Sequence, residues 1–312
     1  MYSEKGLTPI AFFLITLLFL TAAFTGTAVA VKGEKFSPLL KVGTLNESMS
    51  GAASKVKETL TGSGFKIIGE YSPEGKESLK SIAYTRKDLQ DITLQVKDRG
   101  LLASILKVGL NKVDGKIEVS MVNPEYLFRV YLMKEFYKHE DGLKAIASEA
   151  RAALKNVGNE FKPFGGELKA KRLEHYHYKI GMEYFDDPVE LAEYESFDKG
   201  LETIRKNLAD KKGGAYEVFS LVRSDAKTAV FGIGLGDKET GELFFLPKIG
   251  ERHVAALPYE VILMDGKATM LHGRFRIATH WPSLSMIFGK YSFAKIMSTP
   301  GAIYKTMLEV TK

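Results

Sequence analysis

The sequence lacks cysteine altogether: none of its 312 residues is one. Iron–sulfur clusters, zinc ribbons, disulfides, covalent haem attachment and thiol nucleophiles all need the cysteine sulfur, so the sequence excludes each of these chemistries. Without disulfides, a packed core alone must stabilise the folded chain. A chain of this length buries enough apolar surface to do so.

Short motifs of the common enzyme classes are also missing. We find no nucleophile elbow, metalloprotease helix motif, calcium loop or phosphate-binding loop. The glycine-rich segment Gly232 to Gly236 has Asp237 where a dinucleotide-binding fingerprint needs its third glycine. We therefore expect these alternating glycines to admit the close approach of another backbone or side chain in a strand. The sequence favours a non-catalytic protein and implies no cofactor.

The chain has only a small excess of positive charge. The chain has 44 Lys and Arg against 38 Asp and Glu, which gives a net charge of +6, and its pI is near 9.1. This mild excess is compatible with anionic lipid head groups or acidic partners. The sequence has no zinc-finger spacing and no aromatic-plus-basic RNA signature, so we expect no nucleic-acid partner.

Long hydrophobic runs are scarce, and the sequence has one, from Pro9 to Val31. It follows Lys5 and ends in Ala28-Val29-Ala30, the small-x-small pattern that a signal peptidase accepts. We interpret residues 1–30 as a secretory signal peptide. The alternative is an uncleaved N-terminal membrane anchor, because the run is long enough to span a bilayer. Both interpretations predict a periplasmic or other extracytoplasmic location for the rest of the chain.

What the sequence does contain is a faint internal repeat with an offset of 151 residues. The repeat keeps polarity, turns and order rather than residue identity. Corresponding segments are Phe65–Ile68 and Tyr216–Phe219, Ile82 and Ile233, Leu106 and Leu257, and Asp114–Lys116 and Asp265–Lys267. After this block we match Asn123-Pro124 to Trp281-Pro282. The alternative is chance similarity between two α+β halves.

Each copy is predicted to combine helices with antiparallel strands. In the second copy the pattern predicts a helix over 197–209 and strands over 216–222, 229–235, 242–246, 259–264 and 268–278. The Asp-Gly pairs at 114–115 and 265–266 predict tight hairpins. Pro282 is expected to open a helix near Met297, and Thr299-Pro300 the last helix, to about Val310.

This order of elements predicts an α+β fold made of two tandem repeats, each a mainly antiparallel sheet packed against helices. We expect the first α+β repeat over 43–158 and the second over 196–312. Residues 159–195 are predicted to be a connector with a strand of its own, which bridges the two repeats.

The second copy resembles a known family. Phe231-Gly232-Ile233, then Ala255 to Val261, and the Asp265-Gly266 hairpin are similar to the central pattern of the small prokaryotic domain of unknown function 302 (DUF302). Leu257-Pro258 keeps the family's leucine-proline step, while Tyr259 stands at its cysteine position and Asn123-Pro124 matches its closing dipeptide.

The resemblance covers about residues 43–154 and 196–310. It implies a compact α+β unit that commonly pairs, so that tandem copies would form an intramolecular pseudo-dimer. It implies no established reaction.

His175 and His177 are the candidate metal ligands. In a strand, residues two apart point to the same face, and imidazoles placed so can share a metal ion. A third ligand, such as Glu174, His253 or His272, would have to come from the fold. The alternative interpretation is a solvated polar face opposite the aromatic side chains of Tyr176 and Tyr178.

Four residues of the second copy are the candidate ligand-binding residues: Tyr259, His280, Trp281 and Phe288. His280-Trp281-Pro282 is predicted to mark a strand-to-helix junction where the single tryptophan lines a pocket, and its alternative role is that of a core anchor. The apolar residues of the C-terminal helices are candidates for the roof of a hydrophobic cavity, with an ordinary core as the alternative.

Three functional hypotheses follow. The first is an exported non-catalytic protein that binds a small hydrophobic or anionic ligand or another cell-envelope protein. The second is a metal-dependent enzyme or metal carrier that uses His175 and His177. The third is a structural or assembly factor that the N-terminal segment tethers to the membrane surface.

Overall fold

The computed structural model describes residues 33–312, which form one compact unit. The predicted signal peptide or anchor, residues 1–30, lies outside the described residues. Within residues 33–312, no helix combines the length and apolarity needed to cross a membrane.

The first half of the described chain forms a six-stranded antiparallel sheet in the order β3-β4-β5-β6-β2-β7, with four helices. Its elements are β2 (Leu39–Leu45), α1 (Met49–Gly62), β3 (Lys66–Tyr71), β4 (Leu79–Thr85), α2 (Lys87–Leu94), β5 (Leu106–Val113), β6 (Lys116–Val122), α3 (Pro124–Leu132), α4 (Glu140–Leu154) and β7 (Lys162–Phe164).

The second half forms a five-stranded antiparallel sheet in the order β10-β11-β12-β13-β9. Its elements are β9 (Pro188–Glu193), α6 (Phe197–Ala209), β10 (Ala215–Arg223), β11 (Thr228–Leu235), α7 (Glu242–Ile249), β12 (Tyr259–Met264), β13 (Lys267–Leu271), α8 (Gly273–His280) and α9 (Thr299–Thr311). The structure therefore confirms an α+β fold with antiparallel sheets.

Between the halves, β9 lies inside the segment that the sequence marked as a connector, and it pairs with β13 at the edge of the second sheet. Earlier in that segment, β8 (Leu168–Lys169) pairs with β1 (Lys35–Phe36), and α5 (Ala170–Leu173) follows. The connector thus contributes strands to the fold around it.

Local signals explain where several elements begin and turn. The hydroxyl of Ser48 accepts a hydrogen bond from Gly51 N at the start of α1, and Ser196 accepts one from Lys199 N at the start of α6. Asp114 and Gly115 both have positive φ, as the two central residues of a tight hairpin turn require. Asp265 has the same conformation in the second hairpin. These predicted turns and the predicted helix 197–209 are confirmed.

Three predicted elements are wrong. Residues 242–246 belong to α7, not to a strand, because a five-residue apolar run does not distinguish the two by itself. The predicted strand over 268–278 ends at Leu271, and α8 follows, capped by the His272 side chain. Pro282 opens no helix, since residues 281–292 are irregular and only the 3₁₀ turn η7 (Phe293–Ile296) precedes α9.

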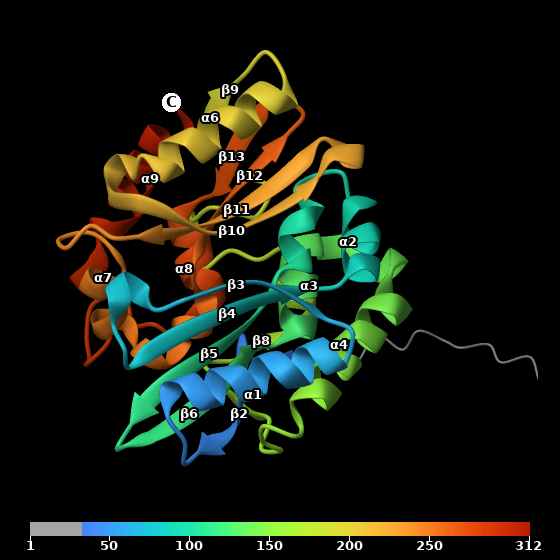
Figure 1. Cartoon of the computed structure of the whole chain (residues 1–312), viewed down its shortest axis with the longest axis vertical. Coiled ribbons are helices and arrows are strands. Elements are labelled where there is room, and N and C mark those ends of the chain that lie inside the picture. The colour runs from blue at the N-terminus through green and yellow to red at the C-terminus, as the bar shows by residue number, and fades with distance from the viewer. Residues whose placement is uncertain (1–32) are drawn as a thin grey trace, which may run out of the picture. The chain divides into compact units, whose positions relative to one another are not determined.

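The helices lie in layers against the sheets. Figure 1 shows α6 and α9 on the outer side of the second sheet, α1 on the outer side of the first, and α3 and α8 between the two sheets. The edge strands β3 and β10 contact each other, with Gly69 against the backbone of Val218. The two sheets thus meet along these edges.

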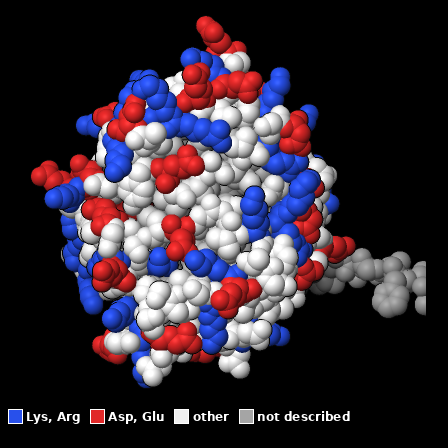
Figure 2. Space-filling model, viewed as in Figure 1, with Lys and Arg blue, Asp and Glu red and all other residues white. Residues whose placement is uncertain are grey.

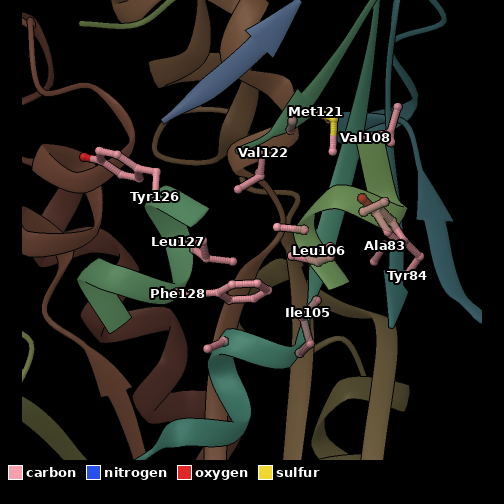
Figure 3. Close-up of a cluster of buried hydrophobic side chains, with 14 of the residues drawn as sticks. Ala83, Tyr84, Ile105, Leu106, Val108, Met121, Val122, Tyr126, Leu127 and Phe128 are labelled. Carbon is pink, nitrogen blue, oxygen red and sulfur yellow. The ribbon is translucent and has the colours of Figure 1, made fainter. Parts of the chain in front are cut away.

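Two hydrophobic cores hold the halves together. The larger core contains most of the apolar side chains of the first half and includes Phe219, Leu221, Val230 and Ile262 of the second. In Figure 3, Leu127 and Phe128 of α3 point toward Leu106 and Ile105 at the start of β5. The second core packs around α6 and α9. Because one core draws on both halves, the described chain packs as a single body.

Candidate functional site

A buried ion cluster joins the two halves. Lys107 on β5 forms an ion pair with one oxygen of Glu260 on β12, and Arg276 on α8 binds the other, with Nη2 at 2.6 Å. The three side chains are 7% exposed or less. Arg276 also donates hydrogen bonds to the carbonyls of Ala256 and Pro258, both at 2.8 Å. The cluster therefore connects β5 of the first half to the leucine-proline step of the second.

Burial is the main cause of the pKa shifts of Lys107 and of the neighbouring His280. Burial lowers the pKa of Lys107 to about 8, against the opposing effect of the Glu260 carboxylate. Burial also lowers the pKa of His280 well below its ordinary value, and the neighbouring Arg276 and Lys107 cations add to this shift. His280 is consequently a neutral imidazole beside a cationic cluster.

The candidate ligand-binding residues separate into buried and exposed members. Tyr259 is 3% exposed, its hydroxyl donates to the Leu271 carbonyl at 2.7 Å, and Arg276 lies 5.0 Å over its ring. His280 and Trp281 are buried neighbours whose ring centres are 6.3 Å apart. Phe288, in contrast, is 79% exposed. The structure brings the first three together around α8 and places Phe288 on the surface.

His253 was predicted only as a possible third metal ligand. In the structure its ring stacks on Trp281, and the two ring centres are 5.1 Å apart. Burial lowers the pKa of His253 to about 3. Within residues 33–312, the ring nitrogens of His253, His280 and Trp281 have no hydrogen-bond partner of good geometry. The sequence does not predict that His253 lies beside His280 and Trp281, because η6 (Glu251–Ala256) and the end of α8 meet only in the fold.

The cavity beside Trp281 is small. It has a volume of about 20 Å³ and is lined by Tyr178, Met182, Arg274, Ile277, Ala278, Trp281, Leu284, Met286 and Phe293. A space of this size holds about one water molecule. The surrounding apolar residues therefore form a nearly filled core here.

The candidate metal ligands His175 and His177 lie in an irregular turn after α5 rather than in a strand. Both pack against Tyr184, whose ring centre is 4.3 Å from that of His175 and 4.6 Å from that of His177. Of the residues considered as a third ligand, Glu174 accepts a hydrogen bond from Tyr137, and His272 lies 3.5 Å from Glu183. In the described part of the chain, no three His, Asp or Glu side chains form a group that would hold a metal ion. Metal binding by the pair stays a prediction.

A second buried acid lies where β3 meets α7. The hydroxyl of Tyr71 donates a 2.8 Å hydrogen bond to Glu242, whose side chain is fully buried. Burial raises the pKa of Glu242 to about 8, so this carboxyl is protonated at neutral pH. It is another polar contact between the halves.

An open groove of about 830 Å³ lies at the edge of the junction. Arg99 and its neighbour Asp98 line it from the first half, and the start of α6 and the β12–β13 hairpin line it from the second. Its charged side chains have both signs: Asp98, Glu193, Glu195, Asp198 and Asp265 against Arg99, Lys227 and Lys267. Most residues that line the groove are charged or polar, unlike those of the hydrophobic pocket that the sequence suggested.

An exposed apolar surface lies on two neighbouring segments, residues 178–182 and 286–297. Tyr178 and Leu284 join them, since the tyrosine hydroxyl donates to the leucine carbonyl at 2.8 Å. The most exposed side chains of this apolar surface are Ile180 (99%), Phe288 (79%), Met297 (68%) and Ile287 (64%). On the face in Figure 2, acidic and basic side chains are interspersed.

The chain has a weak structural similarity to a solved protein. No protein-family model and no curated protein matches the chain. Among solved structures, the chain is similar to the crystal structure of an uncharacterized conserved DUF302 protein from Bacillus stearothermophilus, with 14% identity and a TM-score of 0.28. The match covers 38% of this chain and 95% of that chain.

Proposed function

We propose that the described chain consists of two tandem copies of one α+β module that resembles DUF302. The strand order β3-β4-β5-β6-β2 in the first sheet has the same pattern as β10-β11-β12-β13-β9 in the second. Ser81 pairs with Gly109 and Gly232 pairs with Glu260, which is the same register displaced by 151 residues in both strands. An experimental structure whose two halves fail to superpose would refute this part of the proposal.

In function, we propose an exported, non-catalytic binding protein whose binding site is the apolar surface of residues 178–182 and 286–297. The observation that carries the proposal is the exposure of Phe288, Ile287 and Ile180 on two adjoining segments. Contiguous exposed apolar side chains mark sites of interaction with proteins, membranes or ligands. The cavity beside Trp281 has room for about one water, so a hydrophobic partner binds outside the core.

Export and a periplasmic location are proposed on the sequence of residues 1–30. N-terminal sequencing of the protein recovered from its native cells tests this. A mature N-terminus near Val31 supports signal cleavage, and an intact N-terminus in the membrane fraction supports the anchor. Recovery of the uncleaved chain from the cytosol would refute export.

The binding proposal is tested by retention of residues 31–312 on a phenyl matrix. We expect strong retention that Phe288→Ser and Ile287→Ser both reduce, with no change in melting temperature, because the removed side chains lie outside the core. Val113→Ser is the matched control, since Val113 is 44% exposed at the end of β5, outside the two segments that form this surface. Equal retention of all four proteins would refute the assignment of the surface.

A further inference from the structure

We infer that the partner of the apolar surface is a lipid bilayer with anionic head groups. The inference rests on the proposed function and names its partner. Residues 266–308 contain six Lys and Arg and no Asp or Glu, in a chain whose charges are otherwise almost balanced. This stretch includes the exposed loop with Ile287, Phe288 and Met297. Arg276 of this stretch is buried in the Glu260 cluster, but Lys290 and Lys295 are exposed in the same loop as the apolar side chains.

The loop that carries Phe288 is held in a defined shape. Ser285 and Ser292 form a β-bridge at its base, and Phe293 N donates to the Ser285 carbonyl at 2.8 Å. Across the loop, the Lys295 ammonium donates to the carbonyls of Gly289 and Lys290, at 3.1 and 2.8 Å. A loop ordered before it binds loses little conformational entropy on binding.

Lysine side chains lie beside the exposed apolar side chains, and the loop of residues 286–297 contains no Asp or Glu. The exposed Lys290 lies two residues after Phe288 in the sequence, and its ammonium is 5.2 Å from the Tyr291 ring. On the adjoining turn, Lys179 precedes the fully exposed Ile180. The nearby acid Glu183 lies 3.2 Å from Arg274, which neutralises it. Lys179 and Lys290 therefore lie next to the protruding side chains of Ile180 and Phe288, while the exposed acids Asp186 and Asp187 follow the first segment in the sequence.

This combination fits a membrane interface better than a protein partner. Protein interfaces are depleted of lysine, and their anchors fill pockets on the partner. At a membrane, apolar and aromatic side chains enter the boundary between head groups and acyl chains, and nearby lysines bind anionic lipids. Long lysine side chains also keep their ammonium groups in water while their stems contact apolar material.

Vesicle sedimentation of residues 31–312 tests the inference. We expect binding to vesicles of phosphatidylcholine mixed with phosphatidylglycerol, weaker binding to phosphatidylcholine alone, and loss of the difference at high salt. Lys290→Gln and Lys179→Gln should each weaken binding to the anionic vesicles about fivefold. Phe288→Ser should weaken binding to both kinds of vesicle, and Lys199→Gln on α6 should change neither.

The possible outcomes separate the inference from the proposed function. Equal binding to neutral and anionic vesicles overturns the anionic lipid assignment. Retention on the phenyl matrix that depends on Phe288, without binding to either vesicle, also overturns it and indicates a protein or small-molecule partner. Loss of phenyl retention itself overturns the proposed function.

Discussion

At the scale of single residues, the buried ion cluster at the junction depends on one carboxylate. Glu260 is the acidic partner of both Lys107 and Arg276, and all three side chains are buried. Charges in a low-dielectric interior are stable only when they are paired and hydrogen-bonded. Neutralising Glu260 therefore leaves two buried cations without their anion.

We expect Glu260→Gln to lower the free energy of unfolding by about 3–5 kcal/mol, the usual effect of breaking a buried ion pair from one side. Urea denaturation measures it. The matched control is Glu202→Gln, which removes an exposed partner of Lys199 and should change the free energy by less than about 1 kcal/mol. Similar effects of the two substitutions would show that Lys107 and Arg276 do not need the Glu260 carboxylate for stability.

A second residue-scale prediction concerns pH. The pKa of Glu242 is raised from 4.5 to about 8 in the folded chain, so between these values the folded chain binds one proton more than the unfolded chain does. The contribution of Glu242 to stability is therefore complete below about pH 4.5 and is lost as the pH rises to about 8, with a slope of at most about 1.4 kcal/mol per pH unit.

The substitution Glu242→Gln tests this dependence, because an amide at this position resembles the protonated acid and does not titrate. Chemical denaturation across pH 5 to 8 should show that the difference in free energy of unfolding between Glu242→Gln and the natural protein grows in favour of the variant as the pH rises. A difference independent of pH would mean that Glu242 is ionised in the folded chain.

At the scale of elements, the alternating glycines of β11 have a packing role. A Cβ atom at Gly232 would overlap the Phe219 ring, and one at Gly234 would overlap the Tyr216 ring, both from the neighbouring strand β10. The sequence-based expectation that these glycines admit a close approach is confirmed. Aromatic rings that cover strand glycines compensate for the missing side chains.

Gly232→Ala is expected to destabilise the fold by about 1–3 kcal/mol, because the added methyl group overpacks the sheet. Gly62→Ala is the control: Gly62 ends α1 with no atom within 4 Å of the added carbon, and alanine there should be neutral or stabilising by up to about 1 kcal/mol. Thermal melts of the two variants measure the contrast. A harmless Gly232→Ala would mean that the Phe219 ring moves aside freely.

Elements with strong local signals were predictable, and the others were not. The helix α6 and strand β12 match their predicted bounds because their apolar periods and flanking turns agree. The helix α8 was missed because its start depends on contact between Gly273 and Pro300 of α9 and on the His272 cap. Asn123-Pro124 begins α3 and His272-Gly273 begins α8, whereas Trp281-Pro282, the predicted match of Asn123-Pro124, follows the end of α8.

At the scale of the whole molecule, the second sheet completes the core of the first half. Phe219, Leu221, Val230 and Ile262 lie in that core, and an isolated second half would lack the first-half side chains of the core. Burying four such side chains contributes about 6–12 kcal/mol, which equals the net stability of a typical domain.

Residues 188–312 alone are therefore expected to show no cooperative thermal transition as a monomer, and residues 33–187 alone should melt at a lower temperature than the intact protein. Mixing the two fragments should restore one transition with the mass of a complex. Circular dichroism and size-exclusion chromatography measure this. A monomeric second half with its own sharp transition would refute the interdependence of the halves.

The sequence alone determined the absence of thiol chemistry, because that depends only on composition. It also determined the α+β class, the hairpin turns and the strands with strong alternation, because these depend on neighbours close in the chain. Only the tertiary structure decided that Lys107 meets Glu260, that His253 stacks on Trp281, and that Phe288 points to solvent while Tyr259 is buried. A periodic pattern shows which face of an element is apolar. What covers that face depends on contacts between residues that lie far apart in the chain.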